Sequence, residues 1–191
     1  MTDLACFIGG NWIAGAGEAL TSTNPVDGTE LWSATQATAA DVGDAIANAR
    51  ASQLAWETAS LEHRSAVLTR FADALRTDGS ALADAISAET GKPRWEAQTE
   101  VSSVIGKVAL SIEAHADRNP DVTIGEVASL THRPVGVVGV LGPFNFPAHL
   151  ANGQIIPALL AGNAVVYKPS ELTPLVATVH TRLLVEAGVP P

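Results

Sequence analysis

Two short apolar runs with a helical segment between them constrain the fold of this chain more than any other feature. Residues 135–141 are Val or Leu at every position except two glycines, and residues 164–167 read Ala-Val-Val-Tyr. Continuous apolar runs of this length are typical of parallel strands buried on both faces. Residues 150–160 between them have the composition of a helix that Pro157 bends or divides. This order predicts a βαβ unit, and residues 175–186 are expected to add a helix that Pro174 opens.

A parallel sheet needs more than two strands, because its faces and edges have to be covered. The chain ends shortly after the second predicted strand and its helix. We therefore expect the sequence to be the first part of an open α/β domain, that is, a fragment.

Four more helices are predicted between Ala39 and Arg118, where the apolar residues repeat with a period of about 3.6. Gly91 is expected to end the third of them and Asn119-Pro120 the fourth. The residues expected to face inward are Val42, Ala45, Ile46, Ala49, Gln53 and Trp56; Val67, Leu68, Phe71, Ala74 and Leu75; Leu82, Ala85, Ile86 and Glu89; and Trp95, Val101, Val104, Ile105, Val108, Ile112 and His115.

Short strands are expected on both sides of this helical region. Residues 7–13 predict a hairpin around Gly-Gly-Asn, and residues 24–28 predict a turn before a strand at residues 30–32. Residues 34–40 are expected to lead into the first helix. Strands are also predicted at residues 122–124 and 127–131.

Charge and composition exclude several classes of function. The net charge is −9, whereas nucleic-acid binding needs a basic stripe. The single cysteine cannot form an internal disulfide, and no Cys/His group has the spacing of a metal site. The sequence shows neither a secretory signal at its start nor the ~20 apolar residues of a membrane helix. We expect a cytoplasmic protein.

Asn145 is the first candidate for chemistry, because it follows the first buried strand in Leu-Gly-Pro-Phe-Asn-Phe-Pro, residues 141–147. Ligands of open α/β sheets bind beyond the carboxyl ends of the strands. In a nearly dry setting, the Asn145 carboxamide could stabilise an oxyanion developing on a carbonyl substrate. The alternative is that Asn145 hydrogen-bonds its own turn.

Lys168 and Glu171 follow the second strand in the equivalent position, within Lys-Pro-Ser-Glu. A carboxylate there would accept hydrogen bonds from both hydroxyls of a ribose and would repel a 2′-phosphate, which favours NAD over NADP. The alternative is a solvated ion pair heading a helix. Gly136, Gly139 and Gly142 do not form the usual dinucleotide fingerprint and are weak evidence for a nucleotide site.

The remaining reactive side chains carry weaker signals. Cys6 has no activating neighbour and is expected to be a small, partly buried thiol rather than a nucleophile. His149 is the only histidine close to Asn145 in the sequence. Glu89 and Glu100 have the local pattern of ordinary helix residues.

Taken together, these motifs resemble the aldehyde dehydrogenase family. Residues 142–147 are similar to the family's Pro-Trp-Asn-Phe-Pro segment, with Phe144 in place of the commoner tryptophan. Residues 89–93, 157–163 and 168–171 are similar to other family segments, and the likeness extends from about Phe7 to Pro191. Residues 89–97, 132–134 and 145–150 resemble the branch that oxidises N-succinylglutamate 5-semialdehyde in arginine catabolism.

The resemblance implies a fold. It is the N-terminal part of the family fold, with helices packed on a parallel Rossmann-like sheet and a protruding β-hairpin. Residues 1–120 would form the N-terminal hairpin and the helical part of the cofactor domain. Residues 121–134 would be an oligomerisation hairpin that makes the full-length protein a homo-oligomer, and residues 135–191 would begin the NAD-binding βαβα unit. The catalytic domain would be absent.

The resemblance also implies residue roles in the oxidation of a small-molecule aldehyde through a cysteine thiohemiacetal, with NAD as cofactor. Asn145 would be the catalytic oxyanion donor. The other implied positions are Leu141, Gly142, Pro143, Phe144, Lys168, Ser170 and Glu171 for NAD, and Phe146, Val101, Val104 and His149 for the substrate channel.

The chain departs from the family in one respect: the catalytic cysteine, the general-base glutamate and a later Gly-rich loop would all lie beyond Pro191. We therefore expect these 191 residues alone to be inactive. The alternatives are a non-catalytic dinucleotide-binding or assembly module that is complete at this length, and a cysteine hydrolase that uses Cys6.

Overall fold

A pair of parallel strands lies at the centre of the computed structural model, which describes residues 5–191. Strands β7 (Val137–Leu141) and β8 (Ala164–Lys168) pair in register, with Leu141 opposite Lys168. Helix α5 (His149–Leu160) connects them and contains Pro157, and α6 (Pro174–Glu186) follows β8. The predicted βαβ unit and the α/β fold class are confirmed.

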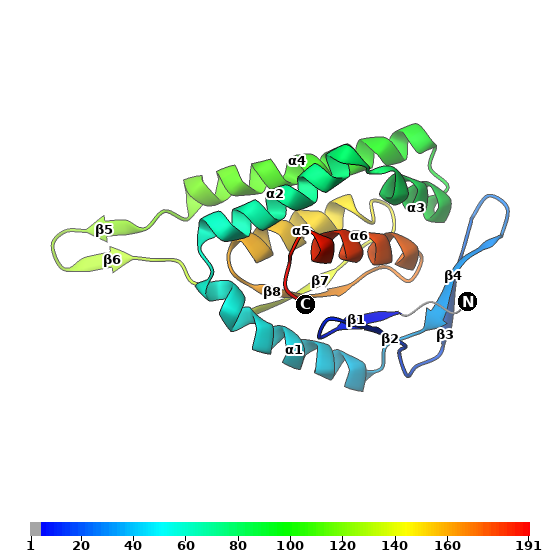
Figure 1. Cartoon of the computed structure of the whole chain (residues 1–191), viewed down its shortest axis with the longest axis horizontal. Helices are drawn as coiled ribbons and strands as arrows, with labels where there is room; N and C mark the ends of the chain where they lie inside the picture. Colours follow the sequence, from blue (N-terminus) through cyan, green and yellow to red (C-terminus); the bar gives the residue numbers. More distant parts are fainter. Residues whose placement is uncertain (1–4) are drawn as a thin grey trace.

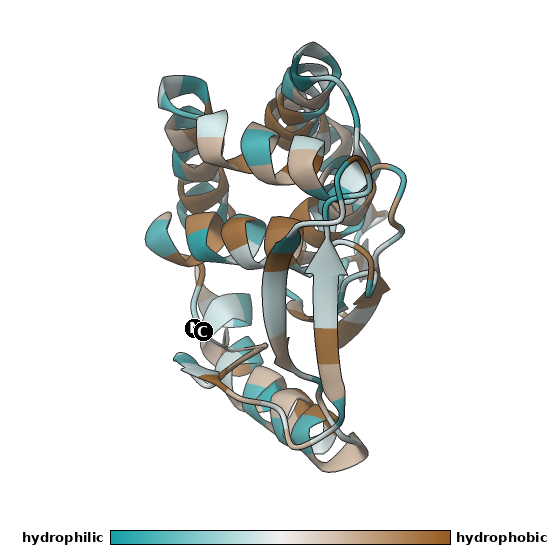
Figure 2. Ribbon diagram, turned by 90° about the vertical axis from the view of Figure 1, so that its right-hand side faces the viewer, coloured by the Kyte–Doolittle hydropathy of each residue, from teal (hydrophilic) through white to brown (hydrophobic). Residues whose placement is uncertain are grey.

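The helices form layers on this strand pair (Figure 1). Helices α5 and α6 lie over one face, and α1 (Ala39–Thr58) contacts β7 and β8 from the other side. Helices α2 (Leu61–Thr77) and α4 (Arg94–Arg118) cover α5, while α3 (Ser80–Thr90) packs on α4 and α6. Figure 2 shows these layers from the side, with apolar and hydrophilic residues on each helix. Within residues 5–191, no helix is both long and apolar enough to cross a membrane.

The hydrophobic core lies between the two helix layers. Its largest fully buried apolar side chains come from α2 to α6 and from β7, and they include Phe71, Leu68, Ile86, Ile156, Val140 and Val176. Trp56 of α1 joins this core, and its indole N–H donates a 2.8 Å hydrogen bond to the Leu159 carbonyl. The four helices predicted before Asn119 are therefore confirmed as elements.

The N-terminal strands were predicted only in part. The hairpin of β1 (Cys6–Ile8) and β2 (Asn11–Ile13) is confirmed, but β3 (Ala19–Thr23) was not foreseen. It pairs with β4 (Glu30–Thr35), so the turn predicted at residues 24–28 is the loop of a second hairpin. Residues 34 and 35 thus belong to a strand and not to the approach to α1. The sequence Ala-Leu-Thr-Ser-Thr of β3 is largely polar, which hides a strand whose Ser22 is nevertheless buried.

Several side chains expected inside are exposed in the described chain. In α1, Trp56 is buried but Val42 and Ile46 are not, and in α4 Trp95 lies on the surface. In β7, Val140 is the one fully buried residue, and Leu141 is 74% exposed. Four of the five residues of β7 are therefore half-buried or exposed, which corrects the expectation of a strand buried on both faces. In α2, Ala72 and not Ala74 faces the core.

The hairpin predicted after the last of the four helices stands apart from the helix layers. Strands β5 (Val122–Ile124) and β6 (Ala128–Leu130) pair antiparallel and protrude beyond the end of α4 (Figure 1). All six of their residues are exposed. Both strands are confirmed.

A buried polar link joins three of the helices. His180 of α6 is fully buried, and its Nε2 donates to Asn152 Oδ1 of α5 at 3.1 Å. Asn152 Nδ2 donates to the Val104 carbonyl of α4, also at 3.1 Å. Burial lowers the pKa of His180 to about 4, so the ring is neutral near pH 7.

We expect this histidine to make the fold less stable in acid. The unfolded chain protonates His180 near its ordinary pKa of about 6.5, whereas the folded chain takes up the proton only near pH 4. The free energy of unfolding should therefore fall by about 2 kcal/mol between pH 7.5 and pH 5 on account of this one group.

Urea unfolding at both pH values measures this effect, with His180→Gln as the matched variant. Gln does not titrate in this range and can still donate to Asn152 Oδ1. An identical pH dependence in both proteins would contradict the prediction.

Candidate functional site

The candidate site lies at the edge of the sheet where β7 and β8 end. Because Leu141 and Lys168 are register partners, the loops that follow them leave the sheet at the same level. The first loop, residues 142–147, carries Asn145, and the second, residues 169–173, carries Glu171. The structure therefore brings together the two segments that the sequence analysis singled out, at the position where open α/β sheets bind ligands.

The start of the Asn145 loop is fixed by close packing on β8. Gly142 N donates to the Lys168 carbonyl at 2.9 Å, and a Cβ atom at Gly142 would lie 2.9 Å from the Tyr167 ring. Only glycine fits there without a shift. The Tyr167 hydroxyl is 3.5 Å from the Pro147 carbonyl, and burial raises the pKa of Tyr167 far above its usual value, so this group remains a donor.

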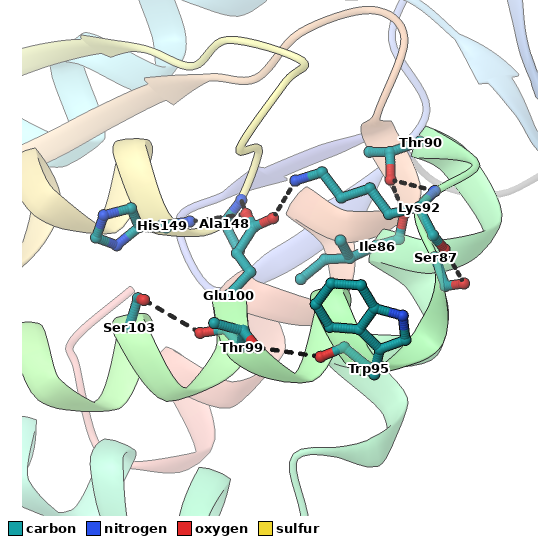
Figure 3. A network of polar contacts seen from close by, with 10 residues as sticks. All are labelled: Ile86, Ser87, Thr90, Lys92, Trp95, Thr99, Glu100, Ser103, Ala148 and His149. Atoms are coloured by element: carbon teal, nitrogen blue, oxygen red, sulfur yellow. Dashed lines mark hydrogen bonds and ion pairs between the residues drawn. The ribbon is translucent and has the colours of Figure 1, made fainter.

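The end of the Asn145 loop is fixed by a carboxylate from another helix. Ala148, at the start of α5, has no capping side chain of its own. Instead, Glu100 Oε1 of α4 accepts hydrogen bonds from the N–H groups of Ala148 and His149 at 3.0 and 3.1 Å (Figure 3). The carboxylate satisfies donors that a helix start leaves free and lies at the positive end of the helix dipole.

Glu89 of α3 does the same for the helix that follows β8. Its two carboxylate oxygens accept from Leu175 N and Val176 N, both at 2.9 Å, at the start of α6. Burial raises the pKa of Glu89, and the hydrogen bonds from both amides act against that shift. Sequence reasoning missed both glutamates. The available signal was that the predicted inward face of α3 included an acidic residue, Glu89.

Asn145 is exposed, which corrects the expectation of a nearly dry setting. Phe144, Phe146 and Leu141 around it are exposed as well. Among residues 5–191, the Asn145 carboxamide makes no hydrogen bond, so it does not hold its own turn. Its N–H groups are free to donate to a ligand.

Lys168 and Glu171 form an ion pair of 3.2 Å and are both about two-thirds exposed. A hydrogen bond from its own backbone N–H, followed by the contact with Lys168, lowers the pKa of Glu171 and keeps it ionised. Ser170 is buried, and its hydroxyl accepts from Leu172 N at 3.2 Å, which shapes the loop that presents Glu171. The solvated ion pair exists, and it stands at the sheet edge where a ligand would reach it.

The other predicted site residues do not all reach this edge. Val104 is fully buried and Val101 nearly so, and both pack in the helical core of the described residues, so their predicted place along a substrate channel stays a prediction. Gly142 and Pro143 lie at the edge itself, and half-buried His149 opens α5 with its ring turned away from Lys92 (Figure 3).

Cys6 lies in β1 of the first hairpin and not at the edge where β7 and β8 end. Partial burial raises the pKa of its thiol, and the charge of Asp41 adds to this shift. A raised pKa reduces the thiolate fraction, which argues against a nucleophile. Within the part of the chain that the structure describes, no group of three or more His, Cys, Asp or Glu side chains could hold a metal ion.

Comparison with known sequences gives one family. Residues 12–191 match the model of the aldehyde dehydrogenase family. The chain is 49% identical over 187 residues to the N-succinylglutamate 5-semialdehyde dehydrogenase of Chromobacterium violaceum, covering 96% of this chain and 38% of that protein. For the enzyme of the same name from Burkholderia lata, the identity is 50% over 194 residues, covering 100% of this chain and 39% of that protein. The chain therefore spans less than half the length of these relatives.

Comparison with solved structures agrees. An aldehyde dehydrogenase C variant from Pseudomonas syringae, in complex with NAD+ and octanal, superposes with a TM-score of 0.92 at 31% identity, over 100% of this chain and 39% of that one. The NADP-dependent glyceraldehyde-3-phosphate dehydrogenase of Bacillus halodurans, complexed with NADP, gives 0.91 at 28% identity, over 100% of this chain and 42% of that one.

Gly142→Ala is expected to lower the free energy of unfolding by about 1–3 kcal/mol, because the added methyl group overlaps the Tyr167 ring. Gly139→Ala is the matched control, since a Cβ atom there meets nothing within 4 Å. Urea unfolding of both variants measures the difference. Equal losses in the two would show that the Gly142 contact does not constrain the loop.

Proposed function

The chain belongs to the aldehyde dehydrogenase family, and from this premise we propose that it forms the cofactor-binding part of an enzyme that oxidises an aldehyde to a carboxylic acid. The observation that carries the proposal is the pairing of Leu141 with Lys168, which presents the Asn145 loop and the Glu171 loop at one sheet edge. The identity of 49–50% to semialdehyde dehydrogenases supports the same activity.

The residues at this edge fit a dinucleotide. The Glu171 carboxylate and Lys168 ammonium are exposed where ribose hydroxyls could meet them, and Leu141 and Phe144 offer exposed apolar surface beside them. When bound, NAD supplies the hydride acceptor of the reaction. An ionised Glu171 favours NAD over NADP by repelling a 2′-phosphate. Both cofactors occur among the similar structures.

Asn145 is proposed to stabilise the negative charge that develops on the aldehyde oxygen when a nucleophile adds to the carbonyl carbon. Its carboxamide is unpaired within the described residues and is carried by a loop that is fixed at both ends. A donor placed in advance loses little free energy to reorganisation during the reaction. Phe146, next along the loop, is proposed to border the path of the substrate.

The nucleophile is proposed to come from outside these 191 residues. Cys6 lies in the first hairpin, and its raised pKa disfavours the thiolate. Addition of a cysteine thiolate elsewhere in the protein to the aldehyde would give the thiohemiacetal whose oxygen Asn145 holds, and hydrolysis of the later thioester would release the acid.

The proposed substrate is N-succinylglutamate 5-semialdehyde, the compound in the names of the relatives at 49–50% identity. This molecule is anionic; within residues 5–191, Lys92 beside the Asn145 loop is paired with Glu100 and Arg94 is paired with Asp84, so we propose that groups binding its carboxylates come from elsewhere in the protein. The exposed hairpin of β5 and β6 is proposed to join a second copy of the protein.

In the full-length gene product, Asn145→Ala is expected to lower kcat by about 10²–10³-fold, because one oxyanion donor is lost. NADH formation from the semialdehyde measures the effect, and the polypeptide of residues 1–191 should give none. Asn48→Ala, at an exposed position of α1, is the control and should keep wild-type kcat. A kcat for Asn145→Ala within twofold of wild type would refute the assignment.

Glu171→Gln is expected to raise the ratio of kcat/KM with NADP to kcat/KM with NAD by about tenfold, because the charge that opposes a 2′-phosphate is removed. Steady-state kinetics with each cofactor give this ratio. Glu186→Gln, at the exposed end of α6, removes the same charge away from the sheet edge and should leave the ratio unchanged. The cofactor assignment fails if both variants behave alike.

A further inference from the structure

The backbone of Lys92 is fixed between α3 and α4. Gly91 ends α3 in the left-handed region with a φ of 71°, and its N–H donates to the Ser87 carbonyl. Lys92 N donates to Thr90 Oγ1 at 3.3 Å, and the Lys92 carbonyl accepts from Ser87 Oγ at 2.7 Å (Figure 3). Both backbone polar groups of this residue are therefore held by the end of α3.

The Lys92 side chain extends from this point to the Asn145 loop. Its Nζ lies 2.8 Å from Glu100 Oε2 and 3.8 Å from the centre of the Phe146 ring. The Lys92 side chain is 14% exposed and that of Glu100 is fully buried. A cation this close to a ring face, largely shielded from water, is attracted by the ring quadrupole.

Glu100 links this lysine to the other end of the loop. Its Oε2 binds Lys92, while its Oε1 accepts from Ala148 N and His149 N. The residues that follow Asn145 are thus held at two neighbouring points, the Phe146 ring by Lys92 and the first turn of α5 by Glu100. Neither contact touches Asn145 itself, which remains exposed.

We propose that Lys92, held by Glu100, is a positioning residue for the reaction: its ammonium fixes the Phe146 ring and thereby the adjacent Asn145 carboxamide. The inference rests on the proposed function. Oxyanion donors have to be placed within about 0.5 Å of their working position, and small displacements cost large factors in rate. An exposed asparagine on a loop attains that accuracy only if its neighbours are locked.

A different activity of the variants is expected if the ion pair between Lys92 and Glu100 only stabilises the fold. Removing Lys92 alone leaves the buried Glu100 carboxylate without its cation, which destabilises the fold. Removing both charges in Lys92→Leu with Glu100→Gln relieves that penalty, because Gln can still accept from the α5 amides. If the pair acts only through stability, activity should return together with stability. If Lys92 positions Phe146, activity should stay low.

The test uses the full-length gene product. We expect Lys92→Leu to lower kcat about tenfold and to change the dissociation constant of NAD by less than twofold. The double variant should recover most of the lost melting temperature while its kcat stays about tenfold low. Lys92→Arg, which keeps a cation that can lie over the ring, should keep kcat within about threefold of wild type.

Lys107→Leu is the matched control. Lys107 is a half-buried lysine of α4 that forms no ion pair within residues 5–191, so its loss should leave kcat unchanged. The proposal is overturned if Lys92→Leu keeps wild-type kcat, or if the double variant regains kcat together with stability.

A second measurement separates this inference from the proposed function. With [ε-¹³C]lysine labelling, the Lys92 ε signal should be displaced by the ring current of Phe146, and Phe146→Leu should abolish that displacement. Absence of NADH formation by the wild-type protein would refute the proposed function but leave this contact measurable. Absence of the displacement would refute the positioning of Phe146 whatever the activity.

Discussion

The in-register pairing of β7 with β8 is the constraint on which the rest of the site depends. Leu141 lies opposite Lys168, so two loops that are more than twenty residues apart in the sequence leave the sheet at one level. Helix α5 fills the interval between the strands and packs against both of them. A shift of one residue in this register would turn alternate side chains to the opposite face and separate the loops from their supports. The position of both loops, and so of the site, is therefore set by the pairing of the two strands.

Buried carboxylates connect the outer helices to this edge. Glu89 and Glu100 reach from α3 and α4 to the first amides of α6 and α5, the helices that follow the two loops. A helix start that lacks its own cap needs such partners, because free N–H groups buried without acceptors cost stability. The outer layer thus does more than cover the core: it sets where the helices begin, and so where the loops end. Exposed Asn145 and Glu171 are therefore carried by loops that run into helices whose first amides are hydrogen-bonded to buried carboxylates.

The sequence predicted the parts of this arrangement that depend on local composition. Apolar runs at residues 135–141 and 164–167 were sufficient for the βαβ unit, and ordered motifs such as residues 142–147 were sufficient for the family. Strand β3 was not predicted, because Thr21, Ser22 and Thr23 do not alternate with apolar residues. The capping function of Glu100 could not be seen, because its amide partners lie 48 and 49 residues further along. Burial was overestimated for Asn145 and Leu141, since it depends on what surrounds the sheet edge rather than on the residues themselves.

A crystal structure of the full-length gene product with NAD would test the central claim most directly. We expect the adenosine ribose hydroxyls to lie within about 3 Å of the Glu171 carboxylate and Asn145 to face the nicotinamide end of the same ligand. We also expect the β7–β8 register and the Glu100 contacts with Ala148 and His149 to be unchanged. Density for NAD away from the ends of β7 and β8, with neither Asn145 nor Glu171 in contact with it, would contradict the proposed site.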